Sequence, residues 1–201
     1  MQELMQMYKR NIKSLKIFVI VIILMLMLVL LFGMEFAGRK DDEQNEKLNS
    51  MDYFTHFTIK TVDGGQISEE VLKNAKVTVF NGWAPWCGPC TGEMPDLQKL
   101  SEDYASKGLQ VVGIVADYYQ TQDKTSYLGE VQSVIDYTGV RYPICLSDEE
   151  FNTGAFPTMG NSFPGTWAVD SEGHLLEFVS GAREEAAWRT LFDKWLEEAS
   201  K

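Results

Sequence analysis

The sequence predicts an α/β fold, a three-layer sandwich with a mixed central sheet, and two features carry this prediction. Between residues 76 and 148, apolar strand-like runs alternate with helix-like segments, the order in which crossover helices join parallel strands. The chain then ends in a hairpin and an amphipathic helix, which adds antiparallel strands to the sheet. This domain, residues 53–201, has about 150 residues, an ordinary size for one hydrophobic core.

The first elements are expected around two signals. The run YFTHFTIKTVDGGQIS, residues 53–68, alternates around Asp-Gly-Gly and predicts a short hairpin. KVTVFNGW, residues 76–83, is β-rich and apolar throughout and predicts a buried strand. Residues 92–108 carry apolar side chains at helical spacing up to Gly108, so we expect a helix there, kinked at Pro95.

The remaining strands and helices of the domain are predicted from the same kinds of pattern. Residues 109–117 (LQVVGIVAD) predict a second buried strand, residues 126–139 a helix and residues 141–148 (RYPICLSD) a third strand. Residues 165–181 form two strand-like runs around Ser-Glu-Gly, and residues 183–200 a terminal helix. The apolar face of that helix carries Trp188, Leu191, Phe192, Trp195 and Leu196.

The N-terminal part predicts a membrane anchor. Residues 17–34 contain no charge, and as a helix they would span roughly 27 Å, close to a hydrocarbon core of about 30 Å. A cleaved signal peptide is the alternative, but Glu35 and Phe36 stand where small residues are needed. Cations in residues 1–16 predict a cytoplasmic N-terminus, and residues 35–52 form a charged tether.

The orientation places the domain outside the cytoplasm, at the cell membrane. The net charge is −11, and from residue 33 onward 14 basic residues face 28 acidic ones. Such a surface repels phosphate backbones, so a nucleic-acid partner is not expected. The acidic excess is explained by solubility alone.

The stretch FNGWAPWCGPCTGEMP places Cys87 and Cys90 three residues apart, which fits a metal site, a structural staple or a redox pair. A zinc site needs four ligands, and the chain adds only Cys145, His56 and His174. A staple over so short a loop constrains little of the unfolded chain. Dithiol–disulfide exchange is therefore the chemistry that we expect, with no other cofactor and no metal.

The spacing assigns roles within the pair. Cys87 falls at the start of a helix, where unpaired N–H groups stabilise a thiolate, so it is the expected nucleophile, and Cys90 the resolving cysteine. Gly88 and Pro89 stand between them, and a proline N–H is not needed in a first helical turn. Glu93, one turn further, is the candidate to accept the proton of Cys90; the alternative is a solvated acid favoured by the helix dipole.

WAPWCGPCTGEMP, followed far downstream by FPGTWAVDSEG, resembles the thioredoxin superfamily, and more narrowly its membrane-anchored TlpA/ResA-like thiol–disulfide oxidoreductases. The resemblance covers Phe54 to the C-terminus and implies a thioredoxin-like fold. It implies that Glu93 is the acid that tunes the cysteines. Asn81 stands where cytoplasmic thioredoxins carry a buried aspartate, and asparagine is common there in TlpA-like members.

The resemblance also implies a substrate groove. Pro164, after Phe163, matches the cis-proline that faces the cysteine pair. Pro157 also follows a phenylalanine, but only Pro164 leads directly into a predicted strand. At Gly165 the chain departs from the family, which often has threonine there.

The remaining candidates receive simpler interpretations. Trp83 is expected in the core, whereas Trp86 is expected to form an apolar rim for partner peptides. Cys145 lies in a predicted strand and is expected to be a buried, inert thiol. His56 and His174 are expected at the surface.

These observations predict a membrane-tethered, extracytoplasmic disulfide reductase. A disulfide-forming oxidant would use the same motif, but Gly-Pro between the cysteines matches the reducing thioredoxins. A peroxidase of related fold would need a Pro-x-x-x-Thr-x-x-Cys setting, and a copper chaperone a C-x-x-x-C pair with a histidine; both are absent. The resemblance implies electrons from a CcdA/DsbD-type membrane thiol carrier, and apocytochrome c, other oxidised extracytoplasmic proteins or a methionine sulfoxide reductase as substrates.

Overall fold

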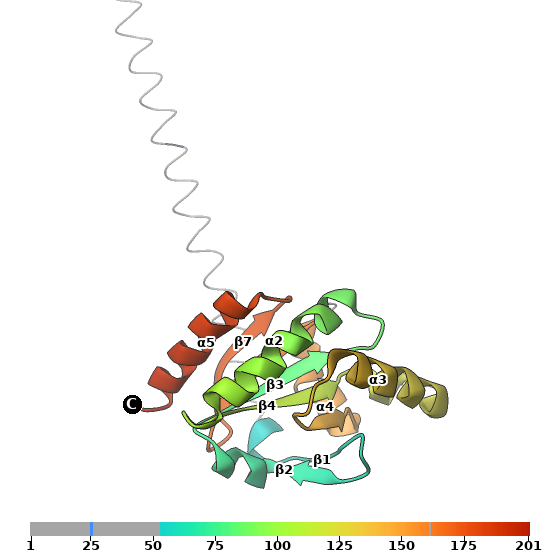
Figure 1. Ribbon diagram of the computed structural model, residues 1–201. Helices are drawn as coiled ribbons and strands as arrows, with labels where there is room; N and C mark the ends of the chain where they lie inside the picture. The colour runs from blue at the N-terminus through green and yellow to red at the C-terminus, as the bar shows by residue number, and fades with distance from the viewer. Residues whose placement is uncertain (1–24, 26–52, 161) are drawn as a thin grey trace, which may run out of the picture. The chain divides into compact units, whose positions relative to one another are not determined.

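The computed structural model describes residue 25 and residues 53–160 and 162–201 (Figure 1). The predicted cytoplasmic N-terminus, membrane anchor and charged tether, residues 1–52, lie outside this part of the chain apart from residue 25. Among the helices of the described residues, none combines the length and the apolar character that a membrane span requires.

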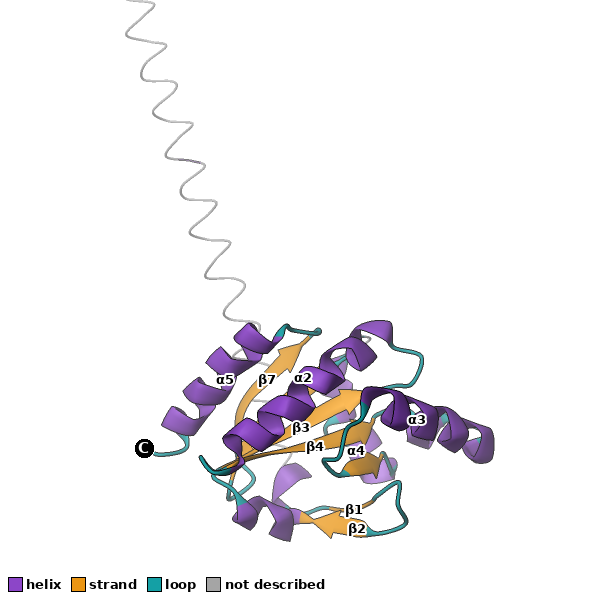
Figure 2. Ribbon diagram, viewed as in Figure 1, coloured by secondary structure: helices purple, strands orange, loops and turns teal. Residues whose placement is uncertain are grey.

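A five-stranded mixed sheet in the order β5-β4-β3-β6-β7 forms the centre of the domain (Figure 2). β3 (Val77–Trp83), β4 (Leu109–Val115) and β5 (Ile144–Leu146) are parallel. β6 (Gly165–Asp170) runs antiparallel to β3, and β7 (Leu175–Ser180) runs antiparallel to β6. The predicted mixed sheet is confirmed.

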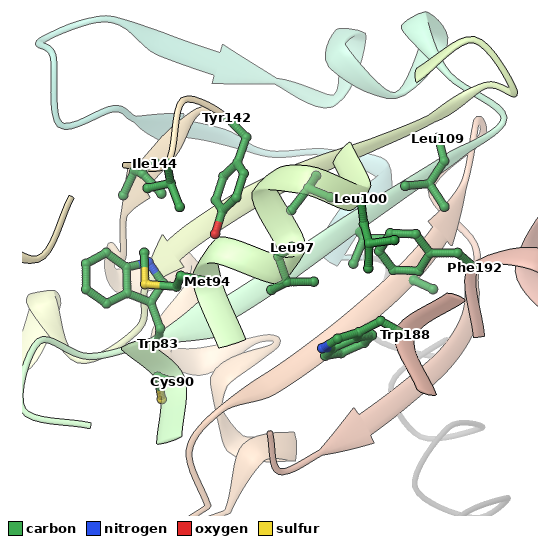
Figure 3. Close-up of a cluster of buried hydrophobic side chains, with 14 of the residues drawn as sticks. Trp83, Cys90, Met94, Leu97, Leu100, Leu109, Tyr142, Ile144, Trp188 and Phe192 are labelled. Carbon is green, nitrogen blue, oxygen red and sulfur yellow. The ribbon is translucent and has the colours of Figure 1, made fainter. Parts of the chain in front are cut away.

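Three long helices and the main hydrophobic core accompany the sheet. They are α2 (Gly88–Ala105), α3 (Lys124–Thr138) and α5 (Glu185–Glu198). Figure 3 shows part of this core between α2, α5 and the strands. Its large, nearly inaccessible side chains include Trp83, Met94, Leu97, Leu100, Trp188, Phe192 and Trp195. Burying an apolar side chain of this kind contributes roughly 1.5–3 kcal/mol.

A second hydrophobic cluster lines the other face of the sheet. The predicted N-terminal hairpin is confirmed as β1 (Thr58–Lys60) paired with β2 (Gln66–Ser68). The short helices of this layer are η1 (Tyr53–Thr55), η2 (Glu69–Asn74), α4 (Glu149–Thr153) and η4 (Phe156–Met159). Residues 149–160 had no sequence prediction, because their apolar side chains follow neither a helical nor a strand period.

Element boundaries differ modestly from the expectations. The third parallel strand is shorter than predicted, three residues within 141–148. α3 begins two residues earlier than expected, where the Asp123 side chain accepts a hydrogen bond from the Ser126 N–H, and ends at Gly139 with φ of 68°. α2 continues through Pro95, and whether it bends there stays a prediction.

Candidate active site

The cysteine pair sits where β3 gives way to α2. Cys87 is the N-cap residue of α2 and is bonded to Cys90, with Cα atoms 5.3 Å apart. The Cys87 sulfur accepts a hydrogen bond from the Cys90 N–H at 3.3 Å. The placement of Cys87 at a helix start is thus confirmed, and the N–H that faces its sulfur also suits a thiolate.

Exposure distinguishes the two sulfur-bearing residues. Cys87 is 4% exposed, whereas Cys90 is completely buried. Gly88 and Pro89 make the first turn of α2, and the N–H that Pro89 lacks would have no partner within the helix. Of the two residues, Cys87 is therefore the one that keeps contact with solvent, and its role as the nucleophile stays a prediction.

Glu93 is buried behind the pair, at 3% exposure. Its Oε1 accepts a hydrogen bond from Asn81 Nδ2 at 3.1 Å, and its Oε2 accepts from the Arg183 backbone N–H at 3.0 Å and from Trp188 Nε1 at 3.2 Å. Burial raises the pKa of Glu93 to about 7, and the hydrogen bonds only partly oppose this rise. The alternative of a solvated helix-start acid is wrong.

The Asn81 side chain links β3, on which it lies, to α2 and β6 through hydrogen bonds. It lies in β3 directly opposite Thr166 of β6, and its Nδ2 donates both to Glu93 and to Thr166 Oγ1, the latter at 3.0 Å. Because Asn81 is neutral and fully buried, Glu93 is the ionisable group of this network. Sequence reasoning missed the partners Thr166, Arg183 and Trp188, since nothing in their local pattern points to a carboxylate.

The predicted groove residues come together beside the cysteines. The Phe163–Pro164 peptide bond is cis, as predicted, and among the described residues it alone is cis, which excludes Pro157. Trp86 is 63% exposed, and its ring meets Phe163 edge-on at 5.1 Å between centroids. Trp86 Nε1 donates to Asp117 Oδ2 at 2.7 Å, a contact that the sequence did not reveal.

The structure explains the departure at Gly165. A Cβ at this position would lie 2.8 Å from Met159 Cγ and 3.2 Å from Phe178 Cε2. Met159 of η4 and Phe178 of β7 therefore occupy the space that a threonine side chain would need. The glycine results from local packing in this chain.

The remaining candidates lie as expected. Trp83 is completely buried in the core. Cys145 is a free, buried thiol in β5, and burial raises its pKa to about 12, which makes it inert near neutral pH. His56 and His174 are exposed.

Three features of this site define a class of protein when they occur on a sheet of this topology. They are a cysteine pair at a helix start, a buried acid behind it and a cis-proline beside it. The class is the thioredoxin-like thiol–disulfide oxidoreductases, and the molecule is an enzyme of that class. The AhpC/TSA family model matches residues 51–177, more than half of the chain. The chain belongs to the AhpC/TSA family.

Named relatives agree with this class. The chain is 32% identical over 125 residues to the thioredoxin-like protein YneN of Bacillus subtilis (strain 168), covering 62% of this chain and 68% of that protein. It is 24% identical over 126 residues to the thiol-disulfide oxidoreductase ResA of Bacillus thuringiensis (strain Al Hakam), covering 63% of this chain and 66% of ResA. The match thus spans about two thirds of these relatives.

A solved structure shows the same fold. It is the thiol:disulfide interchange protein, a thioredoxin family protein, from Chlorobium tepidum TLS, with a TM-score of 0.55 and 26% sequence identity. The likeness covers 72% of this chain and 92% of that one.

Proposed function

We propose that the protein is a membrane-tethered, extracytoplasmic disulfide reductase that acts on protein substrates through Cys87 and Cys90. The observation that carries the chemistry is Glu93, a buried acid one helical turn beyond Cys90 with a pKa of about 7. A group that takes up and releases a proton near neutral pH is what thiol–disulfide exchange needs at the resolving cysteine.

The reaction begins from the reduced pair. The Cys87 thiolate attacks one sulfur of the substrate disulfide, and the other substrate sulfur leaves as a thiolate that takes a proton from solvent. The Cys90 thiol then passes its proton to Glu93 and attacks the Cys87 sulfur, which releases the second substrate thiolate. The substrate gains two electrons and the enzyme is left as the Cys87–Cys90 disulfide, the state of the present structure.

Trapping tests the division of labour between the cysteines. Cys90→Ser should accumulate mixed disulfides with client proteins through Cys87, because the resolving attack is lost. Cys87→Ser should accumulate none, and Cys145→Ser should turn over like the unaltered enzyme. Non-reducing electrophoresis followed by mass spectrometry measures the adducts. Equal trapping by the first two variants would refute the assignment of the nucleophile.

Reduction rather than oxidation is the direction that we propose, because Gly88 and Pro89 separate the cysteines as in reducing thioredoxins. The reduction potential tests this choice. A reductase should lie near the thioredoxin value of about −270 mV, whereas an oxidant of the DsbA kind lies near about −120 mV. A potential at the oxidising end would favour the alternative function.

The anchor determines where the electrons come from. If residues 17–34 hold the domain outside the cytoplasm, no glutathione pool supplies it, so electrons must cross the membrane. We propose a CcdA/DsbD-type thiol carrier as the donor. Apocytochrome c, other oxidised extracytoplasmic proteins or a methionine sulfoxide reductase are the proposed substrates, and the exposed Trp86 beside Phe163 supplies an apolar rim for their peptides.

A further inference from the structure

Three buried polar atoms near the site have no hydrogen-bond partner among the described residues. They are Asn81 Oδ1, Trp83 Nε1 and the Tyr142 hydroxyl. Asn81 and Trp83 are completely buried and Tyr142 is 7% exposed. Buried polar groups are nearly always paired with protein or with ordered water, so three unpaired atoms in one region point to a bound molecule.

Trp83 and Tyr142 approach each other over one position of the sheet, Gly113. A Cβ on Gly113 would lie 3.2 Å from Trp83 Nε1 and also 3.2 Å from Tyr142 Cε2, with Ile144 Cδ1 nearer still at 2.5 Å. Figure 3 shows the Tyr142 hydroxyl pointing into the core on the side of Trp83 and Met94.

Asn81 faces the same place. It pairs with Gly113 across β3 and β4, so both residues direct their side-chain positions to one face of the sheet. Its Nδ2 is turned toward Thr166 on β6, the neighbouring strand on the opposite side. The amide oxygen Oδ1 is the atom of this side chain that has no partner among the described residues.

The chemistry of the three atoms identifies the ligand. An indole N–H only donates, an amide oxygen only accepts, and a hydroxyl does both. One water molecule satisfies this set, whereas a metal cation would find no use for an indole N–H. We propose that Trp83, Tyr142 and Asn81 bind an internal water molecule behind Glu93. Tyr142 also lines a surface pocket of about 330 Å³ together with Thr61, Gln132 and Arg141.

The water affects Glu93 through Asn81. A water that donates to Oδ1 polarises the amide and strengthens its Nδ2–H bond to the carboxylate. Glu93 also interacts with the Arg183 backbone N–H and guanidinium, with the Trp188 indole and, electrostatically, with Tyr142 itself. Tyr142 is therefore a positioning residue that helps to hold Glu93 ionised. This consequence rests on the proposed function, whereas the water does not.

The water is tested directly in the unaltered full chain. A nuclear Overhauser effect should connect the Trp83 indole proton to a water that stays bound for longer than nanoseconds. The measurement uses the resting, oxidised protein and does not depend on activity. Absence of this signal, with other buried N–H protons of the core as the reference, would overturn the proposal.

Tyr142→Phe gives the second test, with Tyr137→Phe as the matched control because Tyr137 is 87% exposed. If the hydroxyl binds water, Tyr142→Phe should raise the equilibrium constant of unfolding about 2- to 10-fold, and the titration midpoint of Glu93 should move to higher pH. Tyr137→Phe should change neither.

The results of these two tests distinguish a bound water from an unpaired hydroxyl. An unchanged or lower unfolding constant in Tyr142→Phe would mean that the hydroxyl is truly unpaired, which refutes the water site. A detected water with an unmoved Glu93 titration would refute the positioning role alone. If Tyr142→Phe does not fold, the signal in the unaltered chain decides. A failure of client trapping would count against the proposed function and leave the water site standing.

Discussion

Glu93 shows how much a single residue depends on its surroundings. Its carboxylate accepts three hydrogen bonds, yet burial still raises its pKa to about 7 from an ordinary value of 4.5. A buried acid with such a pKa is unfavourable for stability at neutral pH and useful for proton transfer there. Glu93 therefore lowers the stability of the folded domain at neutral pH.

The raised pKa of Glu93 predicts that the stability of the protein depends on pH. Below pH 4.5 Glu93 is protonated in both states; as pH rises, the unfolded chain ionises first, so the free energy of unfolding falls until pH passes about 7. The loss is about 3 kcal/mol, at about 1.4 kcal/mol per pKa unit. Relative to the unaltered protein, Glu93→Gln should gain this amount between pH 4.5 and 7, in addition to a constant offset.

Denaturant titrations of the oxidised chain at a series of pH values measure this difference. Glu130→Gln, an exposed glutamate of α3, is the matched control and should leave the dependence in place. Parallel curves for Glu93→Gln and the unaltered protein would show that Glu93 ionises normally.

The burial of Cys145 predicts how its thiol responds to alkylating reagents. Because it is completely buried and its pKa is raised to about 12, iodoacetamide should not label the oxidised folded protein at mildly alkaline pH. The same protein should take up one label after unfolding in denaturant. Intact-mass measurement distinguishes the two cases, and labelling in the folded state would contradict the inert role.

At the scale of elements, α4 and η4 pack against β6 and the residues before it. Phe151 of α4 packs edge-on against Trp167 of β6 at 5.7 Å, and Phe156 of η4 lies 6.2 Å from Phe163. Met159 fills the space beside Gly165, next to the cis-proline. The short helices that the sequence left unassigned thus help to hold β6 in place.

This packing predicts the result of restoring the family's threonine. Gly165→Thr should destabilise the protein by roughly 1–3 kcal/mol, because its side chain overlaps Met159. Met159→Ala alone should cost roughly 2–5 kcal/mol through the cavity that it leaves.

The double variant provides the decisive comparison. Since the threonine then enters space that Met159 has vacated, the combined loss should be smaller than the sum by at least about 0.5 kcal/mol. Denaturant unfolding of the four proteins measures this coupling. Additive losses would mean that Gly165 and Met159 do not compete for the same space.

At the scale of the whole domain, sheet topology assembles the site. β3 is the central strand, and the cysteine pair follows its carboxyl end at the start of α2. β6 runs antiparallel to it, with Gly165 paired to Gly82, so Pro164 enters the sheet beside the same end. Residues far apart in the chain therefore meet where the strand order changes from parallel to antiparallel neighbours, a usual place for a site in an α/β sheet.

The proposed anchor predicts accessibility in the cell. Protease added to intact cells, or to spheroplasts if an outer membrane blocks it, should degrade the domain of residues 53–201 while cytoplasmic markers stay intact. The reason is the cluster of cations before residue 17, which orients the N-terminus toward the cytoplasm. Immunoblotting follows the domain, and detergent lysis is the control that exposes all proteins. A domain protected together with the markers would reverse the orientation.

From the sequence alone we could predict the order of the strands and of the three long helices, the cysteine pair and its place at a helix start. It also indicated Pro164, which leads directly into a strand. These features are local: periodicity, turn residues and short spacing are readable without knowing what packs against them.

The environment of these residues became visible only in the folded structure. Glu93 is a buried acid rather than a solvated one because Arg183 and Trp188, some ninety residues later, fold over it. Gly165 is glycine because Met159 occupies its space, and Tyr142 reaches Trp83 because β5 pairs with β4. Burial and hydrogen-bond partners depend on contacts between distant segments, and a local pattern carries no record of them.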